Sequence, residues 1–307
     1  MIRWVPAIGA LREIFESRTK LLGEKMSSQL GRCYGVGLML TALAIWGCAD
    51  KPKPLVSTAI QPAVATEEKL VWSDEFEGDE LDQSKWKFET GATGWGNNEL
   101  QNYTAGPNVE VSDGTLKIVA KQVKPGKKIG DFTSSRLNSK SSFQYGRLEV
   151  RAKIPKHEGN GVWPAIWMLP DCFPQTSWPL CGEIDIMEYV SCTPDKVHFT
   201  VHSQAFNHMN GKHLNSGPID HPTIDEKFHT YGFNWTRDRI EFYLDEPTNI
   251  QFTVDRPEKA SLENWPFDQK YYFLLNVAVG GGWGGMRGID EGAFPSTMEI
   301  DYVRVYQ

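Results

Sequence analysis

The chain has 307 residues, of which 40% are hydrophobic and 12% aromatic, including 11 tryptophans. A formal net charge of −7 is mildly acidic, which argues against a nucleic-acid partner and indicates no other. The length allows one large β domain or two smaller ones.

Residues 1–47 contain a predicted export signal. After Met26 come Arg32 and an apolar run over 36–46, which is too short to span a bilayer comfortably. The run ends at Gly47 and Cys48, and a small residue before Cys resembles a bacterial lipoprotein cleavage site. We therefore expect translation to start at Met26 and a lipid anchor on Cys48 at the outer membrane or cell surface. Trp46 fits this pattern poorly, so a secreted or periplasmic protein is the alternative.

Residues 48–68 are rich in Pro, Ala, Thr and Lys without a clear period, which predicts a flexible tether. Three cysteines follow in the part expected to fold: Cys172, Cys181 and Cys192. An exported protein can oxidise one pair. A Cys172–Cys181 disulfide would close a short loop, and three buried thiols are the alternative.

Residues 69–307 form the predicted globular domain. GTLKIVAK, GRLEVRAKIP and RIEFYLDE alternate apolar and polar residues, which is typical of strands with one buried face. YYFLLNVAVGGG is more evenly apolar and suits a central strand. Many short strands without a rhythm of intervening helices predict one antiparallel β-sandwich.

The segment GEIDIMEYV carries three carboxylates at Glu183, Asp185 and Glu188. On a regular strand the first two share a face, whereas Glu188 should point to the other face, into the core. A lone ionised Glu buried there would be very costly. A β-bulge at Ile186–Met187 inserts one extra residue and returns Glu188 to the face of the other acids. The core side then takes Ile184, Ile186 and Met187.

Three acids on one face fit a metal site or acid–base chemistry. They point in one direction, which suits a lining better than a closed cage, and no His within the motif completes a transition-metal set. Retaining glycoside hydrolysis needs a carboxylate nucleophile and a protonated carboxyl about 5–5.5 Å apart. With the bulge, the backbones of Glu183 and Glu188 lie about 13 Å apart, and side chains leaning inward by about 4 Å each reach that range. Asp185 between them would keep one neighbour protonated and hold the other in place.

Several tryptophans suit a sugar-binding surface, because indole rings stack on the apolar faces of pyranoses. The candidates are Trp95, Trp163, Trp178 and Trp283. We expect three other tryptophans in the core: Trp86, Trp167 and Trp235.

From about residue 70 to its end, the sequence resembles glycoside hydrolase family 16, and within it the laminarinase-like β-1,3-glucanases. The signature is Glu-x-Asp-x-x-Glu, here EIDIME, in the form with the extra residue. Other matching segments keep the family order: WSDEFEG, GWGNNELQNY, SSRLNSKSSFQYGRLEVRAKIP, WPAIWMLP, HTYGFNW, NVAVGGGWGG and IDYVRVYQ. The resemblance implies a jelly-roll, concanavalin-like sandwich with a concave substrate cleft.

The resemblance makes Glu183 the nucleophile, Asp185 its supporting acid and Glu188 the acid/base. It implies retaining endo-hydrolysis of β-1,3-glucan or mixed-linkage β-1,3/1,4-glucan by a monomer that needs no catalytic cofactor. A galactan hydrolase of the same fold, acting on agarose, porphyran or carrageenan, is one alternative. Others are a non-catalytic glucan-binding lectin, which would lose one or more of the acids, and a structural surface lipoprotein.

The resemblance also implies substrate contacts. Trp178 matches the tryptophan beneath the sugar at the cleavage point, and Asn97 and Arg136 match hydroxyl-binding residues on the donor side. Trp163 lies near the same wall. His202 occupies a position where a histidine commonly touches the acids, and a core histidine is the alternative.

Many family members hold a structural calcium on the convex side. The matching ligands are the carbonyls of Glu75 and Gly114 and the carboxylate of Asp301, with water completing an oxygen shell. An ordinary solvent-facing acid is the alternative for Asp301.

Overall fold

The computed structural model describes residues 68–307. The expected start at Met26, the signal segment, the anchor Cys48 and nearly all of the tether lie outside the described residues. Within residues 68–307, no helix combines the length and apolar character needed to cross a membrane. Only two short 3-10 helices occur in this part of the chain, η1 (His208–Asn210) and η2 (Glu291–Ala293).

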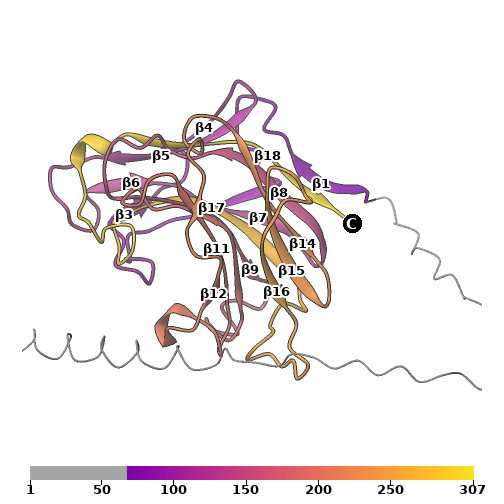
Figure 1. Cartoon of the computed structure of the whole chain (residues 1–307). Helices are drawn as coiled ribbons and strands as arrows, with labels where there is room; N and C mark the ends of the chain where they lie inside the picture. Colours follow the sequence, from indigo (N-terminus) through magenta and orange to yellow (C-terminus); the bar gives the residue numbers. More distant parts are fainter. Residues whose placement is uncertain (1–67) are drawn as a thin grey trace, which may run out of the picture. The chain divides into compact units, whose positions relative to one another are not determined.

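Two β-sheets pack against each other across a common hydrophobic core (Figure 1). The 10-stranded sheet has the order β16-β15-β14-β8-β18-β5-β6-β3, with β1 beside β18 and β4 beside β5. Its strands are β1 (Leu70–Asp74), β3 (Gln101–Tyr103), β4 (Val109–Ser112), β5 (Thr115–Gln122), β6 (Phe132–Ser134), β8 (Gly146–Lys153), β14 (His229–Trp235), β15 (Arg239–Leu244), β16 (Ile250–Asp255) and β18 (Ser296–Tyr306).

The 8-stranded sheet has the order β12-β11-β10-β9-β17-β7-β2, with β13 beside β11. Its strands are β2 (Trp86–Glu89), β7 (Arg136–Phe143), β9 (Val162–Pro170), β10 (Glu183–Glu188), β11 (Lys196–His202), β12 (Leu214–Asn215), β13 (Ile219–Asp220) and β17 (Tyr271–Val279). Apart from the short parallel pair β3–β6, every named strand pairing is antiparallel, which confirms the predicted antiparallel sandwich. The evenly apolar strand β17 lies between β7 and β9, in the interior of its sheet as predicted.

The alternation predicted for β8 is present, with one exception. Leu148, Val150 and Ala152 are buried in the core, but Glu149 on the opposite face is also buried. The hydroxyl of Tyr243 donates a hydrogen bond of 2.7 Å to the Glu149 carboxylate, and the carboxylate also pairs with Arg147. These two partners stabilise a charge that would otherwise be costly to bury.

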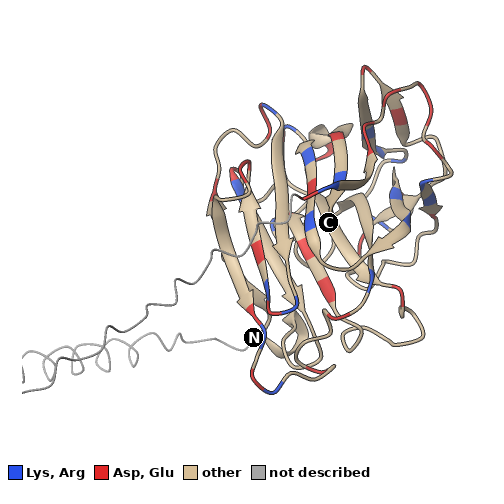
Figure 2. Ribbon diagram, turned by 90° about the vertical axis from the view of Figure 1, so that its right-hand side faces the viewer, with Lys and Arg blue, Asp and Glu red and all other residues tan. Residues whose placement is uncertain are grey.

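The outer face of the 10-stranded sheet carries charges of both signs along its strands (Figure 2). Lys153 on β8 pairs with Glu299 on β18 at 2.7 Å, and Arg151 pairs with Asp301 one step further along the same two strands. This face therefore offers solvent-facing ion pairs across the sheet.

The core contains Trp86 and Trp235, both fully buried as predicted. The prediction for Trp167 was wrong, because this side chain is only partly buried. Trp167 is the cross-strand partner of Asp185, and directly paired residues share a face, so its ring lies on the acidic side of the sheet. All three cysteines of the described part are free thiols, and Cys181 and Cys192 are buried.

Candidate active site

Strand β10 contains the predicted bulge. Along the neighbouring strand β9, the adjacent residues Trp167 and Ile166 are the partners of Asp185 and Met187, so Ile186 is the extra residue. The residues predicted for the core side, Ile184, Ile186 and Met187, are fully buried in the core cluster.

The register with β11 shows that the three acids share one face. Their partners are alternate residues of β11: Glu183 pairs with His202, Asp185 with Thr200 and Glu188 with His198. Residues two apart on a strand point to the same side, and cross-strand partners share that side. The prediction that the bulge gathers the acids on one face is confirmed.

Burial dominates the electrostatics of this trio. It raises the pKa of Glu183 to about 8 and of Glu188 to about 7, and the charge of Glu188 raises that of Glu183 further. Burial, followed by the charges of Glu183 and Glu188, also raises the pKa of Asp185. The three carboxyl groups therefore cannot all be ionised near neutral pH. They keep at least one proton among them.

The neighbours of the two glutamates differ. The positive charge of Arg136, followed by the neighbouring polar groups of Asp185 and Trp178, lowers the pKa of Glu183 and so stabilises its ionised form. Glu188 accepts one hydrogen bond, from the indole nitrogen of Trp163, at 3.2 Å. Burial outweighs these contacts at both residues, and the neighbours of Glu183 favour its carboxylate form more than those of Glu188 do.

His202 contacts the acids, as expected from the sequence, although it is also largely buried. Its Nε2 lies 3.4 Å from the Asp185 carboxylate and 3.7 Å from the Glu183 carboxylate. Burial lowers the pKa of His202, and the nearby His208 and His213 act in the same direction. A neutral imidazole at this position can orient the two acids without removing a proton from them.

Aromatic side chains border the acids on two sides. The Trp178 ring lies 5.8 Å from the ring of His202 and 5.1 Å from that of His208. On the side of Glu188, the rings of Trp163 and Trp283 meet edge-on at 5.5 Å. The sequence did not single out His208, since its neighbours in NHMNGKH give no sign that it would fold back onto Trp178.

Arg136 lies toward the other edge of this sheet. Its guanidinium pairs with Glu89 and lies over the rings of Trp95 and Trp167, at 4.9 and 4.6 Å from their centroids. Trp167 donates a hydrogen bond of 2.7 Å to Asn276. These contacts fix a planar cation and two indole rings on the face that carries the acids.

Asn97 is anchored by a buried carboxyl group that the sequence reading missed. Its side-chain amide donates to Glu99 at 3.0 Å, and Gln101 donates to the other oxygen of Glu99 at 2.6 Å. Gln101 also accepts from the backbone nitrogen of Val279 on β17. The loop that carries Asn97 is thereby tied to the central strand.

The three residues expected to hold calcium line one polar groove, away from the acidic trio. Glu75, Gly114 and Asp301 share this groove with Glu77 and Asp113. The carboxylates of Asp301 and Glu75 already pair with guanidinium groups, those of Arg151 and Arg304.

Comparison with known proteins places this geometry in a family. The sequence profile of "Glycosyl hydrolases family 16" matches residues 96–304. A "Beta-glucanase" from Rhodothermus marinus is 45% identical over 250 residues, which cover 78% of this chain and 85% of that protein.

Two solved structures are similar to more than three quarters of the chain. The laminarinase from Rhodothermus marinus has a TM-score of 0.72 at 42% identity and covers 78% of this chain and 97% of its own. The enzyme SCLam, described as a non-specific endo-β-1,3(4)-glucanase, has a TM-score of 0.72 at 40% identity, and the match covers 80% of this chain and 93% of that one. The chain described here belongs to glycosyl hydrolase family 16.

Proposed function

We propose that the protein is a retaining endo-β-1,3(4)-glucanase whose catalytic domain spans residues 69–307. The observation that carries this proposal is the bulged strand β10, which presents Glu183, Asp185 and Glu188 on one face. Family membership and the similarity to the Rhodothermus marinus laminarinase and to SCLam support glucan as the substrate class.

Glu183 acts as the nucleophile. Its carboxylate attacks the anomeric carbon while Glu188 gives its proton to the departing glycosidic oxygen, so that the C–O bond breaks and a glycosyl ester forms. Glu188 then removes a proton from water, which attacks the same carbon and releases Glu183. Asp185 and His202 position Glu183 and hold a proton beside it, in keeping with their short contacts.

Aromatic and polar residues around the acids bind the chain. Trp178 stacks beneath the sugar that is attacked, and Asn97 and Arg136 bind hydroxyls further along the donor side. Trp163, Trp283 and Trp95 form the walls. The fixed contacts of Arg136 with Glu89 and of Asn97 with Glu99 support this assignment, since held donors position a substrate at little entropic cost.

A galactan hydrolase and a non-catalytic lectin have less support. A lectin has no need of three carboxyl groups with raised pKa values on one face. A reducing-sugar assay across laminarin, barley β-glucan, lichenan, agarose and carrageenan separates the candidates. We expect cleavage of laminarin and of the mixed-linkage glucans. Activity on agarose or carrageenan alone would assign the galactan alternative, and binding without cleavage of any would assign the lectin.

We also propose that calcium binds in the groove lined by Glu75, Gly114 and Asp301. Six carboxylates and two guanidinium groups line this groove, which favours a cation, although Asp301 must first release Arg151. A bound ion that recognises only the folded state raises the melting temperature. A melt that is unchanged by EDTA and by added CaCl2, with no calcium in the purified protein, would contradict this proposal.

We propose that the protein is exported as a bacterial lipoprotein, with Cys48 as the lipidated residue. We propose that its catalytic domain is a monomer. Gly47-Cys48 after the apolar run supports the anchor. Labelling with a radioactive fatty acid in a bacterial host should mark the wild-type protein and not Cys48→Ser. A labelled Cys48→Ser variant, or an unlabelled wild type found in the medium, would favour ordinary secretion.

A further inference from the structure

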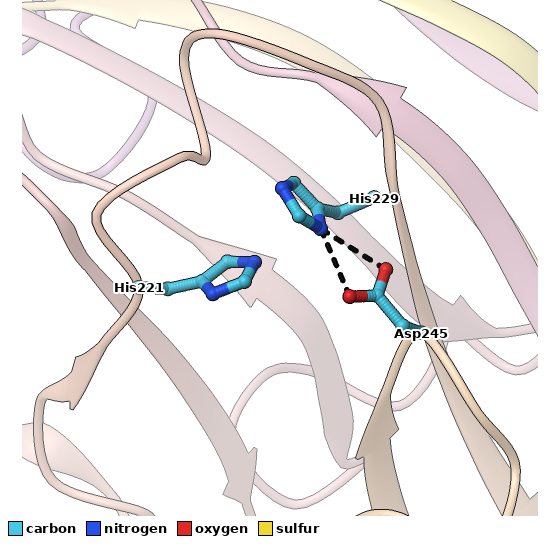
Figure 3. Close-up of side chains that lie close together, drawn as sticks. All are labelled: His221, His229 and Asp245. Atoms are coloured by element: carbon cyan, nitrogen blue, oxygen red, sulfur yellow. Dashed lines mark hydrogen bonds and ion pairs between the residues drawn. The ribbon is translucent and has the colours of Figure 1, made fainter.

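A cluster of two histidines and one aspartate lies apart from the catalytic acids. His221 follows β13, His229 is the first residue of β14, and Asp245 directly follows β15 (Figure 3). Each offers one ligand atom, and these atoms all lie within 4.8 Å of one another. We propose that His221, His229 and Asp245 bind a divalent transition-metal ion, with zinc as the preferred ion.

Two of the three ligands are already at a suitable separation. Nδ1 of His229 lies 3.0 Å from both carboxylate oxygens of Asp245. Tetrahedral zinc with bonds of about 2.0–2.1 Å places its ligand atoms about 3.3 Å apart. The His229–Asp245 pair therefore needs almost no rearrangement to share an ion.

His221 supplies the third ligand from a loop. Its Nε2 is shielded from solvent and has no hydrogen-bond partner among the described residues. Figure 3 shows the edge of its ring turned toward His229 and Asp245. The ligand atoms of the cluster lie within 4.8 Å of one another, so a side-chain movement of up to about 1.5 Å brings this ring within bonding distance of an ion held by the other two. Without an ion, the buried Nε2 of His221 lacks the hydrogen bond that buried polar atoms normally make.

The other nitrogen of His229 is held as metal-ligating histidines usually are. Its Nε2 lies 3.2 Å from the backbone carbonyl of Thr223 and 3.0 Å from the Thr223 hydroxyl. When Nε2–H donates to that carbonyl, the lone pair of Nδ1 is free for a metal, which is the usual second contact of a histidine ligand.

The donor set selects the kind of ion. Imidazole nitrogen suits zinc and related transition metals, whereas calcium prefers an all-oxygen shell. Three protein ligands leave a fourth position for water, and the side chain of Asp245 is 45% exposed, so solvent reaches the site.

The position of the cluster indicates a structural role. The strand before His221, β13, pairs with β11 of the 8-stranded sheet, and the backbone nitrogen of His221 donates to Asp195 at 2.7 Å. His229 and Asp245 belong to β14 and to the end of β15, in the 10-stranded sheet. A bound ion would therefore cross-link the loop that leaves one sheet to the ends of two neighbouring strands in the other.

Metal-stripped protein titrated with ZnCl2, by calorimetry and by thermal melting, tests this site. We expect one zinc per chain at this site and a higher melting temperature. His221→Ala should weaken zinc binding by at least about tenfold, because even the loss of an outer contact costs about 10–100-fold. It should also remove the thermal shift. His157→Ala, which removes an exposed histidine outside the cluster, should behave as wild type.

A second variant guards against a folding defect. Asp245→Asn keeps the side-chain size and should lose the zinc effect while the metal-free protein still melts cooperatively. Zinc could also bind Glu183, Asp185 and His202, but binding there would inhibit hydrolysis and would survive His221→Ala. No zinc binding by the wild type, or binding that is equal in wild type and His221→Ala, would overturn the proposal.

Discussion

The indole nitrogen of Trp163 lies 3.2 Å from Oε1 of Glu188, and this contact lowers the pKa of a carboxyl group that burial has raised to about 7. Trp163 is on β9 and Glu188 on the bulged strand β10, so the bulge and the hydrogen bond depend on the same pair of strands. Without the bulge, Glu188 would point away from Trp163.

Replacing Trp163 by Phe keeps an aromatic wall and removes this hydrogen bond. The bond favours the ionised form of Glu188, so its loss should raise the pKa of Glu188 further. The alkaline limb of the kcat/KM profile, where the acid loses its proton, should then move up by as much as about one pH unit. Trp283→Phe is the matched control. An alkaline limb that moves down, or that moves equally in both variants, would contradict the assignment of Glu188 as the acid.

Glu188 should also influence stability, with a definite dependence on pH. Its pKa of about 7 in the folded state exceeds the ordinary value of 4.5, so its contribution is fully present at low pH and is lost as pH rises through about 7. Glu188→Gln should therefore raise the free energy of unfolding at pH 8 by roughly 1–3 kcal/mol relative to its effect at pH 4. Denaturant melts at both values measure this. Glu226→Gln, at an exposed position, is the control and should show no such difference. If Glu188→Gln changed the free energy of unfolding by the same amount at pH 8 and at pH 4, the raised pKa of Glu188 would be contradicted.

The two glutamates should differ in their response to the leaving group. Glu183→Gln should abolish turnover on every substrate, because an amide cannot form the glycosyl ester. Glu188→Gln should lose about 10²–10⁴-fold on laminarin but little in forming the ester from an activated aryl glucoside, whose leaving group needs no proton. Pre-steady-state release of the aryl alcohol measures this. Equal behaviour of the two variants would show that the roles are wrongly assigned.

Trp178→Ala should lower kcat as well as weaken binding. The ring lies beside His202 and contributes to the ionised state of Glu183, so its loss affects the positioning of the sugar and of the nucleophile. We expect a fall in kcat of about 10–100-fold on laminarin, with a smaller loss for Trp178→Phe. A change confined to KM would indicate that Trp178 only binds.

The buried Glu149–Tyr243 contact makes a prediction about the fold alone. Tyr243→Phe removes the 2.7 Å hydrogen bond to a buried carboxylate and should lower the free energy of unfolding by about 1–3 kcal/mol. Tyr306→Phe, which keeps the ring that stacks under Arg147, is the control and should have little effect. A loss that is no larger for Tyr243 than for Tyr306 would mean that Arg147 alone stabilises Glu149.

The sequence predicted the sandwich and the bulge because both follow from local alternation. On a regular strand Glu188 is in phase with the core residues Ile184 and Ile186 and out of phase with Glu183 and Asp185, and an extra residue resolves that conflict. The side taken by Trp167 could not be predicted in this way, since it depends on register with Asp185 on another strand. The buried state of Glu149 likewise depends on Tyr243, which lies 94 residues away in the chain.

The His221–His229–Asp245 cluster gave no sequence signal for a related reason. Its members come from a loop, the start of one strand and the end of another, with no spacing that marks a metal site. Asn97 was predicted as a binding residue from the resemblance, but Glu99 and Gln101, which hold its side chain, are recognised only from the contacts in the folded protein.

The central claim is that Glu183 and Glu188 act together in a double displacement on β-glucan. Proton NMR of laminarin during the first minutes of digestion tests it most directly, because the anomeric signal of new reducing ends appears before mutarotation. We expect the β-anomer to be released first and the α-anomer to grow in later. Initial release of the α-anomer would mean that water attacks directly, and Glu183 could not then be the nucleophile.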